Sequence, residues 1–231
     1  MKKRLLFCLL CLCLLPVFCG CKSASPYLSA TSELTDNVFF GETESYTITA
    51  LTGKRENPYV SEGVKGETYP FFHITVKVKG ECSLGEEFGV SATVNGETYA
   101  CDLTFSPLGE KLTGSLPVKA PAKDTAVALT VYRGGESQTV TLTCPATVCK
   151  YEDALSSAVN TLGKDVSRHL KKGKFHGEIH ARLTRVQSVT YWFITFIPLE
   201  GESCSALADA STGEVLAVKG VTPSTTPPPS N

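Results

Sequence analysis

The sequence predicts an α+β protein in which a β-sandwich precedes a small domain with one helix on an antiparallel sheet. Two observations lead to this fold class. Short segments between about residues 70 and 145 alternate apolar and polar residues, as half-buried strands do. After Tyr151 the apolar spacing becomes three or four residues, and after Gly173 it returns to two, as expected for a helix followed by strands.

The first domain, expected over residues 37–149, contains five alternating segments that are each bounded by turn residues. Their apolar positions are Ile74, Val76 and Val78; Val90, Ala92 and Val94; Tyr99, Cys101, Leu103 and Phe105; Val127, Leu129 and Val131; and Val140, Leu142 and Cys144. Short strands about ten residues apart are typical of a sandwich with immunoglobulin-like architecture. The Cys…Trp…Cys pattern of antibody domains is absent, so we predict the architecture and not that family.

The second domain, expected over residues 150–219, begins with an amphipathic helix near Tyr151. Gly163 interrupts the helical pattern at a cost of about 1 kcal/mol relative to Ala, which allows a break or a close contact there. Gly173 is a suitable end for the helix. The apolar stripe consists of Leu155, Ala158, Val159, Leu162, Val166 and Leu170.

Two strand patterns follow the helix. In the first, Ile179, Ala181 and Leu183 point one way, and we expect the opposite face to be wet. That face carries His176, Glu178, His180 and Arg182. The second strand, YWFITFIP, is apolar on both faces, so we expect its second face to be covered by the upstream domain, a partner chain or a ligand. The predicted contacts with a partner are Tyr191, Trp192 and Phe196.

A final strand pair is joined by the turn DASTGEV. It matches the D-A-x-T-G-E-[VI] signature of the PepSY domain family through Asp209, Ala210, Thr212, Gly213, Glu214 and Val215. The stretch from Tyr151 to Val218 therefore resembles that family, although only the turn is specific and the basic segment between Gly163 and Glu178 is longer than usual. A convergent α+β hairpin is the alternative. The resemblance implies an extracytoplasmic binding or inhibitory module without catalytic residues, as in propeptides of thermolysin-type metallopeptidases.

The N-terminus has the features of a secretory signal. MKKR precedes an apolar stretch of about 15 residues, which is too short for a comfortable membrane span. Phe18 to Cys21 resembles the bacterial lipobox, which implies that residues 1–20 are removed after Gly20 and that Cys21 carries lipid. The alternative is an ordinary signal peptide cut elsewhere. Residues 21–36 are expected to form a flexible tether and residues 220–231 a disordered Pro-rich tail.

Charge and cysteine content narrow the function classes. Loss of Lys2, Lys3 and Arg4 with the signal would leave 19 basic and 23 acidic residues, so there is no general electrostatic reason to bind nucleic acid. Five cysteines would remain besides Cys21, which permits at most two disulfides within a chain. The candidate pairs are Cys144 with Cys149 and Cys82 with Cys101; alternatively several are buried thiols, and Cys204 is the fifth.

Few residues point to ligand chemistry. The long segment from Gly53 to Phe72 is predicted to be either a binding loop, with Arg55 and Tyr59 as contacts, or a solvated connection. Glu178 and its flanking histidines lack a further nearby ligand and the HExxH spacing, so no metal and no cofactor is predicted. G-x-S-x-G, P-loop and dinucleotide motifs are absent, and we do not expect an enzyme.

These observations predict a non-enzymatic bacterial lipoprotein, anchored by lipid at the extracytoplasmic face of the cell membrane. We expect it to bind an extracytoplasmic protein, as a peptidase inhibitor or modulator, through its PepSY-like domain. One alternative is a lipoprotein that binds or senses small solutes with a transporter. Another is a structural protein of the envelope.

Overall fold

The computed structural model of the protein describes residues 26–56, 62–82, 85–106, 111–119, 125–144, 148–186 and 189–220. Its helices are η1 (Leu28–Ala30), α2 (Tyr151–Leu162) and α3 (Lys164–Ser167). Its strands are β1 (Thr31–Glu42), β2 (Tyr46–Glu56), β3 (Thr68–Val78), β4 (Phe88–Val94), β5 (Glu97–Ser106), β6 (Lys111–Leu116), β7 (Val127–Arg133), β8 (Glu136–Leu142), β9 (Leu170–Lys171), β10 (Lys174–Phe175), β11 (Gly177–Val186), β12 (Val189–Pro198), β13 (Cys204–Asp209) and β14 (Val215–Lys219).

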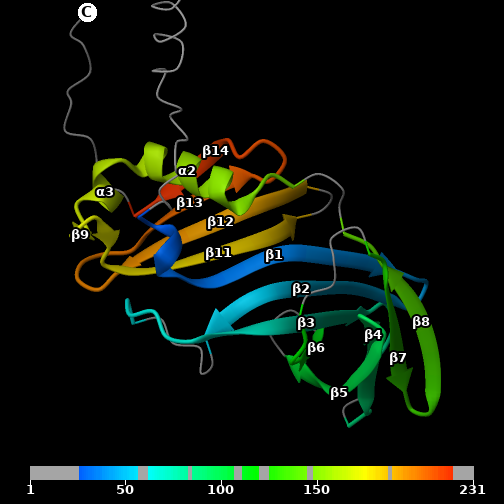
Figure 1. The fold of residues 1–231 in the computed structure, drawn as a ribbon. Coiled ribbons are helices and arrows are strands. Elements are labelled where there is room, and N and C mark those ends of the chain that lie inside the picture. Colours follow the sequence, from blue (N-terminus) through cyan, green and yellow to red (C-terminus); the bar gives the residue numbers. More distant parts are fainter. Residues whose placement is uncertain are drawn as a thin grey trace, which may run out of the picture.

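Twelve strands between Thr31 and Lys219 form one mixed sheet, in the order β14-β13-β12-β11-β1-β2-β3-β6-β5-β4-β7-β8 (Figure 1). Strands β1 and β11 are parallel, and the other neighbours are antiparallel. The sheet curls so that a bridge between Phe40 and Thr143 joins the β8 end to β1. The predicted α+β fold, a sandwich followed by a separate helix-on-sheet domain, is therefore wrong, because one continuous sheet belongs to both parts.

Strand β1 connects the two parts. Its first residues pair with β11 from Thr31 onwards, and the stretch from Leu34 to Glu42 pairs with β2. Two register shifts, between Thr31 and Glu33 and between Thr35 and Asn37, interrupt its ladders. Such bulges break the alternation of buried and exposed residues that identifies strands in a sequence. The segment expected to be a tether up to residue 36 consequently includes the beginning of a buried strand.

Consecutive residues of β1 point into two separate hydrophobic cores, because strand side chains alternate between faces. Val38 joins the core beneath α2, and Phe39 joins the core inside the curled part of the sheet. The sheet therefore buries opposite faces in its two halves. The first core also contains Leu155, Ile179, Leu183, Trp192, Ile194 and Phe196, and the second Ile48, Phe72, Ile74, Leu129 and Leu142.

Helix α2 begins at Tyr151, as predicted, and lies across the sheet over β12 to β14 (Figure 1). It ends earlier than the apolar pattern indicates, because Gly163 adopts a φ of 52° and separates it from the short α3. The buried side of α2 includes Leu155, Ala158 and Leu162. Among the described residues, no helix combines the length and the apolar character needed to cross a membrane.

Candidate functional site

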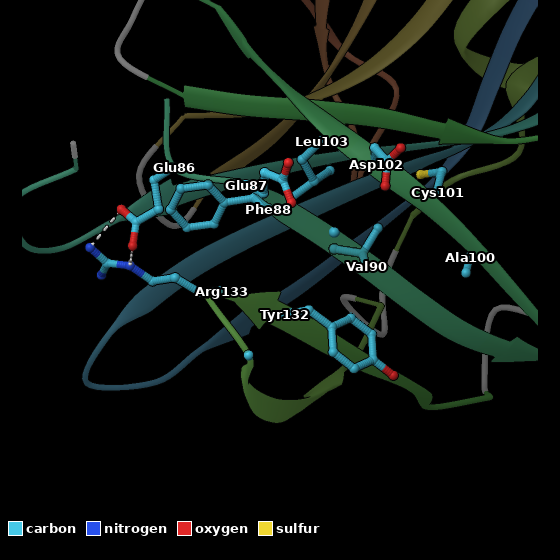
Figure 2. A pocket seen from close by; sticks show the side chains of 13 residues that line it. Glu86, Glu87, Phe88, Val90, Ala100, Cys101, Asp102, Leu103, Tyr132 and Arg133 are labelled. Atoms are coloured by element: carbon cyan, nitrogen blue, oxygen red, sulfur yellow. Dashed lines mark hydrogen bonds and ion pairs between the residues drawn. The ribbon is translucent and has the colours of Figure 1, made fainter. Parts of the chain in front are cut away.

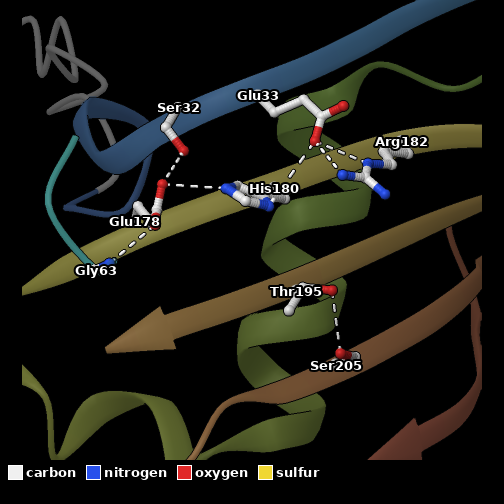
Figure 3. A network of polar contacts seen from close by, with 8 residues as sticks. All are labelled: Ser32, Glu33, Gly63, Glu178, His180, Arg182, Thr195 and Ser205. Atoms are coloured by element: carbon white, nitrogen blue, oxygen red, sulfur yellow. Dashed lines mark hydrogen bonds and ion pairs between the residues drawn. The ribbon is translucent and has the colours of Figure 1, made fainter. Parts of the chain in front are cut away.

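A network of buried polar side chains joins β1 to β11 (Figure 3). Ser32 donates a hydrogen bond of 2.6 Å to Oε2 of Glu178, and Nε2 of His180 lies 3.0 Å from the same oxygen. The other oxygen of Glu178 accepts the N–H of Gly63 at 2.9 Å. These contacts bring together the parallel strand pair and the connection between β2 and β3.

The network continues along β11 through a second carboxylate. Glu33 accepts hydrogen bonds from Nε of Arg182 at 2.8 Å and from Nη2 at 2.6 Å. Nδ1 of His180 lies 3.8 Å from the same Glu33 oxygen. The imidazole therefore stands between two carboxylates, one on each strand.

Glu178 is fully buried, so ionisation is opposed by the loss of water. The hydrogen bonds from Ser32, Gly63 and His180 outweigh this burial and lower the pKa of Glu178 from its ordinary value of 4.5. The buried carboxylate is therefore held in its charged form. The predicted wet face of this strand is wrong at Glu178 and His180, both of which are buried.

The network does not have the arrangement of a catalytic triad. In a triad the imidazole stands between the hydroxyl and the carboxylate and removes the hydroxyl proton. Here Glu178 occupies the middle position, since Ser32 and His180 both contact its Oε2. We interpret the network as a structural connection. No group of metal-ligating side chains capable of holding an ion occurs in the described ranges.

The partner-binding residues predicted on β12 are divided between its two faces. Trp192 and Phe196 are each 1% exposed and belong to the core beneath α2, so neither offers a surface to a partner. Phe193 on the opposite face is 39% exposed, and Tyr191 is half-buried. The sequence pattern indicated two apolar faces correctly, but it did not distinguish the covered face from the more open one.

An apolar row crosses the open side of the sheet. Phe193 on β12 pairs with Leu207 on β13, which pairs with Ala217 on β14. Residues paired across strands share a face, so these side chains lie opposite α2. The row ends at the exposed Ala217 of β14, whereas Val218 pairs with Ala206 of the core beneath α2 and lies on the other face of the strand.

Strand β14 is the free edge of the sheet. In the described part of the chain its only strand neighbour is β13, whereas β12 is paired on both sides. At the other end of the sheet, Phe40 and Thr143 exchange two backbone hydrogen bonds of 2.8 and 2.9 Å. An edge strand presents backbone donors and acceptors to solvent and is a template for another strand.

The DASTGEV turn joins β13 to β14 and uses its own polar groups. Oδ1 of Asp209 accepts the backbone N–H groups of Ser211 at 2.7 Å and Thr212 at 3.2 Å. These bonds lower the pKa of Asp209, led by the bond from the Ser211 hydroxyl. Gly213 has a φ of 77°, and the N–H of Glu214 donates to the Thr212 hydroxyl at 3.2 Å. The turn therefore fixes the connection between β13 and the edge strand β14. Oδ1 of Asp209 is used in hydrogen bonds within the turn itself.

A groove of about 760 Å³ lies over the adjoining ends of β2, β3 and β6. Arg55, one of the two predicted loop contacts, lines it, although Arg55 belongs to β2 and not to a loop. The groove is also lined by Glu56, Tyr69, Phe71, Ser115, Leu116 and Pro117. Tyr59, Gly20 and Cys21 lie outside the described residues.

A larger hollow of about 880 Å³ lies over β4, β5 and β7 (Figure 2). Arg133 donates through Nε and Nη2 to the two oxygens of Glu86 at 2.7 and 3.0 Å. The positive charge of Arg133 in this hollow is therefore already paired with a carboxylate of the protein. Glu87 and Asp102 also line it. Sequence reasoning did not single out these residues, because they lie on or beside ordinary alternating strands.

Cys82, Cys101, Cys149 and Cys204 are free thiols, so neither candidate disulfide is formed in this structure. Cys82 is exposed and Cys204 is buried. Cys149 lies beside the terminal turn, where its N–H donates to the carbonyl of Ala210 at 2.7 Å.

Searches against protein-family models, curated proteins and solved structures found no match to the chain.

Proposed function

We propose that the protein is a non-enzymatic bacterial lipoprotein, anchored to the cell membrane through Cys21, that binds an extended segment of an extracytoplasmic protein at β14. The lipobox-like sequence Phe18 to Cys21 supports the address. The free edge of β14 supports the binding mode.

The exposed apolar side chains of β14 indicate that this edge binds a partner. Leu216 is 53% exposed and Val218 is 40% exposed on a strand that has one neighbour in the described sheet. Proteins commonly protect edges with charged residues, bulges or covering segments. Lys219 and the shift between Leu207 and Ala208 give partial protection, but the apolar row extends to the edge.

Addition of a strand from the partner would use both the free backbone edge of β14 and the apolar side chains near it. Main-chain hydrogen bonds to β14 would supply affinity. Side chains on one face of the added segment would contact the row of Phe193, Leu207 and Ala217, and those on the other face would contact Val218. The binding strand proposed from sequence, β12, is not available for this pairing because β11 and β13 occupy both of its sides. The partner is therefore a protein with an extended segment whose alternate side chains are apolar.

The test places a photo-reactive residue at Leu216 of the full chain in its native bacterium. A matched position, Tyr132 on β7, is 45% exposed and lies in the other half of the sheet. We expect a protein adduct from position 216 that is absent from position 132. Adducts that are identical at both positions, or absent at position 216, would contradict the proposal.

A second experiment tests the binding mode once the adduct is identified. Replacing both Leu216 and Val218 with Lys should weaken binding of the purified partner by at least about tenfold, because lysines on an edge oppose strand pairing. Backbone amides of β14 should also gain hydrogen-exchange protection when the partner binds. Undiminished affinity in a folded variant would exclude β14 as the docking edge.

A further inference from the structure

The groove over β2, β3 and β6, called here the Arg55 groove, is a second feature that edge binding does not use. We propose that it binds a small organic monoanion, a carboxylate attached to a planar apolar body. This site is independent of the protein contact at β14. Three features of the groove support this proposal: the orientation of Arg55, the surrounding charges and the aromatic lining.

Arg55 is positioned to receive an anion. Its guanidinium carbon lies 4.7 Å from the ring centroid of Phe71, and Phe71 is buried. Stacking on a fixed ring restricts the guanidinium while leaving its N–H groups in their fork. No ion pair to Arg55 is found within the described ranges. A carboxylate matches that fork with two parallel hydrogen bonds.

Lys111 adds to the positive potential near Arg55, as its effect on His73 indicates. His73 on β3 and Ser115 on β6 form a hydrogen bond of 2.9 Å, which places the imidazole beside the lining of the groove. Burial lowers the pKa of His73, and the charges of Arg55 and Lys111 lower it further. The lowered pKa keeps His73 uncharged at neutral pH, so the positive charge in this region of the sheet comes from Arg55 and Lys111.

Two carboxylates limit how much negative charge the groove accepts. Glu56 accepts a short hydrogen bond from the N–H of Gly66, and Glu67 interacts with the Tyr69 hydroxyl and raises the pKa of Tyr69. Both acids have protein partners, but their charges remain nearby. A single carboxylate on the ligand fits this balance better than a phosphate dianion, since like charges repel at short range.

The remaining walls suit a flat apolar group. Tyr69 is 44% exposed, and the exposed Pro117 also lines the groove. A volume of about 760 Å³ is within the range of small-molecule sites. Aromatic rings bury large areas and pack face to edge or offset, so a planar ligand would gain contact area here.

The test uses benzoate as the probe and the full chain as the protein, with binding followed by calorimetry and NMR. Benzamide provides a neutral molecule of the same shape, and inorganic phosphate an anion without the apolar body. We expect benzoate to saturate at or below about 10 mM and to bind at least about tenfold more tightly than either comparison compound. Equal binding of benzamide, or no saturation by benzoate, would overturn the proposal.

Arg55→Gln should weaken benzoate binding by at least about tenfold, and Arg55→Lys should recover only part of it because the fork is lost. Arg185→Gln is the matched control, because Arg185 also stacks on a ring, 4.8 Å from Phe40, but does not line the groove. Unchanged benzoate binding by folded Arg55→Gln would overturn the proposal. Photo-adducts at Leu216 should be unaffected by Arg55→Gln, which separates this site from the protein contact.

Discussion

Ser32 on β1 donates a hydrogen bond of 2.6 Å to Glu178 on β11, and both side chains are buried. The bond links the parallel strand pair that joins the two halves of the sheet. Glu178→Gln keeps the side-chain volume but places an N–H₂ group where one of the carboxylate oxygens accepts hydrogen bonds. We expect the free energy of unfolding to fall by about 1–3 kcal/mol, measured by denaturant titration.

Glu202→Gln is the control for that substitution. Glu202 is exposed and lies outside the network. The free energy of unfolding of the Glu202→Gln protein should therefore differ from that of the unsubstituted protein by less than about 0.5 kcal/mol. Equal effects of the two substitutions would show that the Ser32 and Glu178 connection does not stabilise the fold.

The same carboxylate should make stability depend on pH. Because the folded pKa of Glu178 is below 4.5, the unfolded chain takes up the proton first as the pH falls. The stabilisation is complete above the unfolded pKa and is lost as the pH falls through the folded pKa. Unfolding titrations from neutral to acid pH should show a shallower decline for Glu178→Gln than for the unsubstituted protein. Parallel curves would contradict the assignment to Glu178.

Local patterns predicted most elements of this fold but not how they assemble. The alternation around Ile74, Val90 and Leu129 predicted β3, β4 and β7, and the apolar stripe predicted the start of α2. Strand β1 was assigned partly to a tether, because two register shifts and the polar residues TSELTDN mask its alternation. Since β1 joins both halves, missing it led to two separate domains in the prediction.

The candidate sites show the same limit. Arg55 was recognised from a mixed-charge aromatic segment, and the structure places it in a groove. Ser32 lies 146 positions from Glu178, so only the parallel pairing of β1 with β11 brings them together. Burial of Trp192 under α2 was likewise invisible in a strand that is apolar on both faces. Long-range strand order, and not residue type, decides these outcomes.

The terminal turn should stabilise the β13 and β14 hairpin. Asp209→Ala removes the acceptor for the N–H groups of Ser211 and Thr212, so we expect a loss of about 1–2 kcal/mol in unfolding free energy. Hydrogen exchange of β14 amides should become faster. Asp209→Asn keeps an acceptor and should lose less, and equal losses by both variants would contradict this role for the side-chain oxygen.

The two faces of β12 should respond differently to substitution. Trp192→Ser removes a side chain that is 1% exposed, so we expect a loss of about 3–5 kcal/mol in unfolding free energy. Phe193→Ser on the more open face should cost less than about 1.5 kcal/mol. Tyrosine fluorescence or circular dichroism is the suitable probe, because Trp192 is the only tryptophan. A larger loss for Phe193→Ser would reverse the assignment of the faces.

The free thiols should differ strongly in reactivity. Burial, followed by the charge of Asp165, raises the pKa of Cys204 to about 11, whereas Cys82 is exposed. Thiolates are the reactive species, so at pH 8 iodoacetamide should label Cys82 at least about a hundredfold faster than Cys204 in the folded protein. Peptide mapping by mass spectrometry measures both rates, and denaturant should remove most of the difference. A disulfide-linked peptide joining Cys82 to Cys101, or comparable native rates for Cys82 and Cys204, would contradict the free-thiol arrangement.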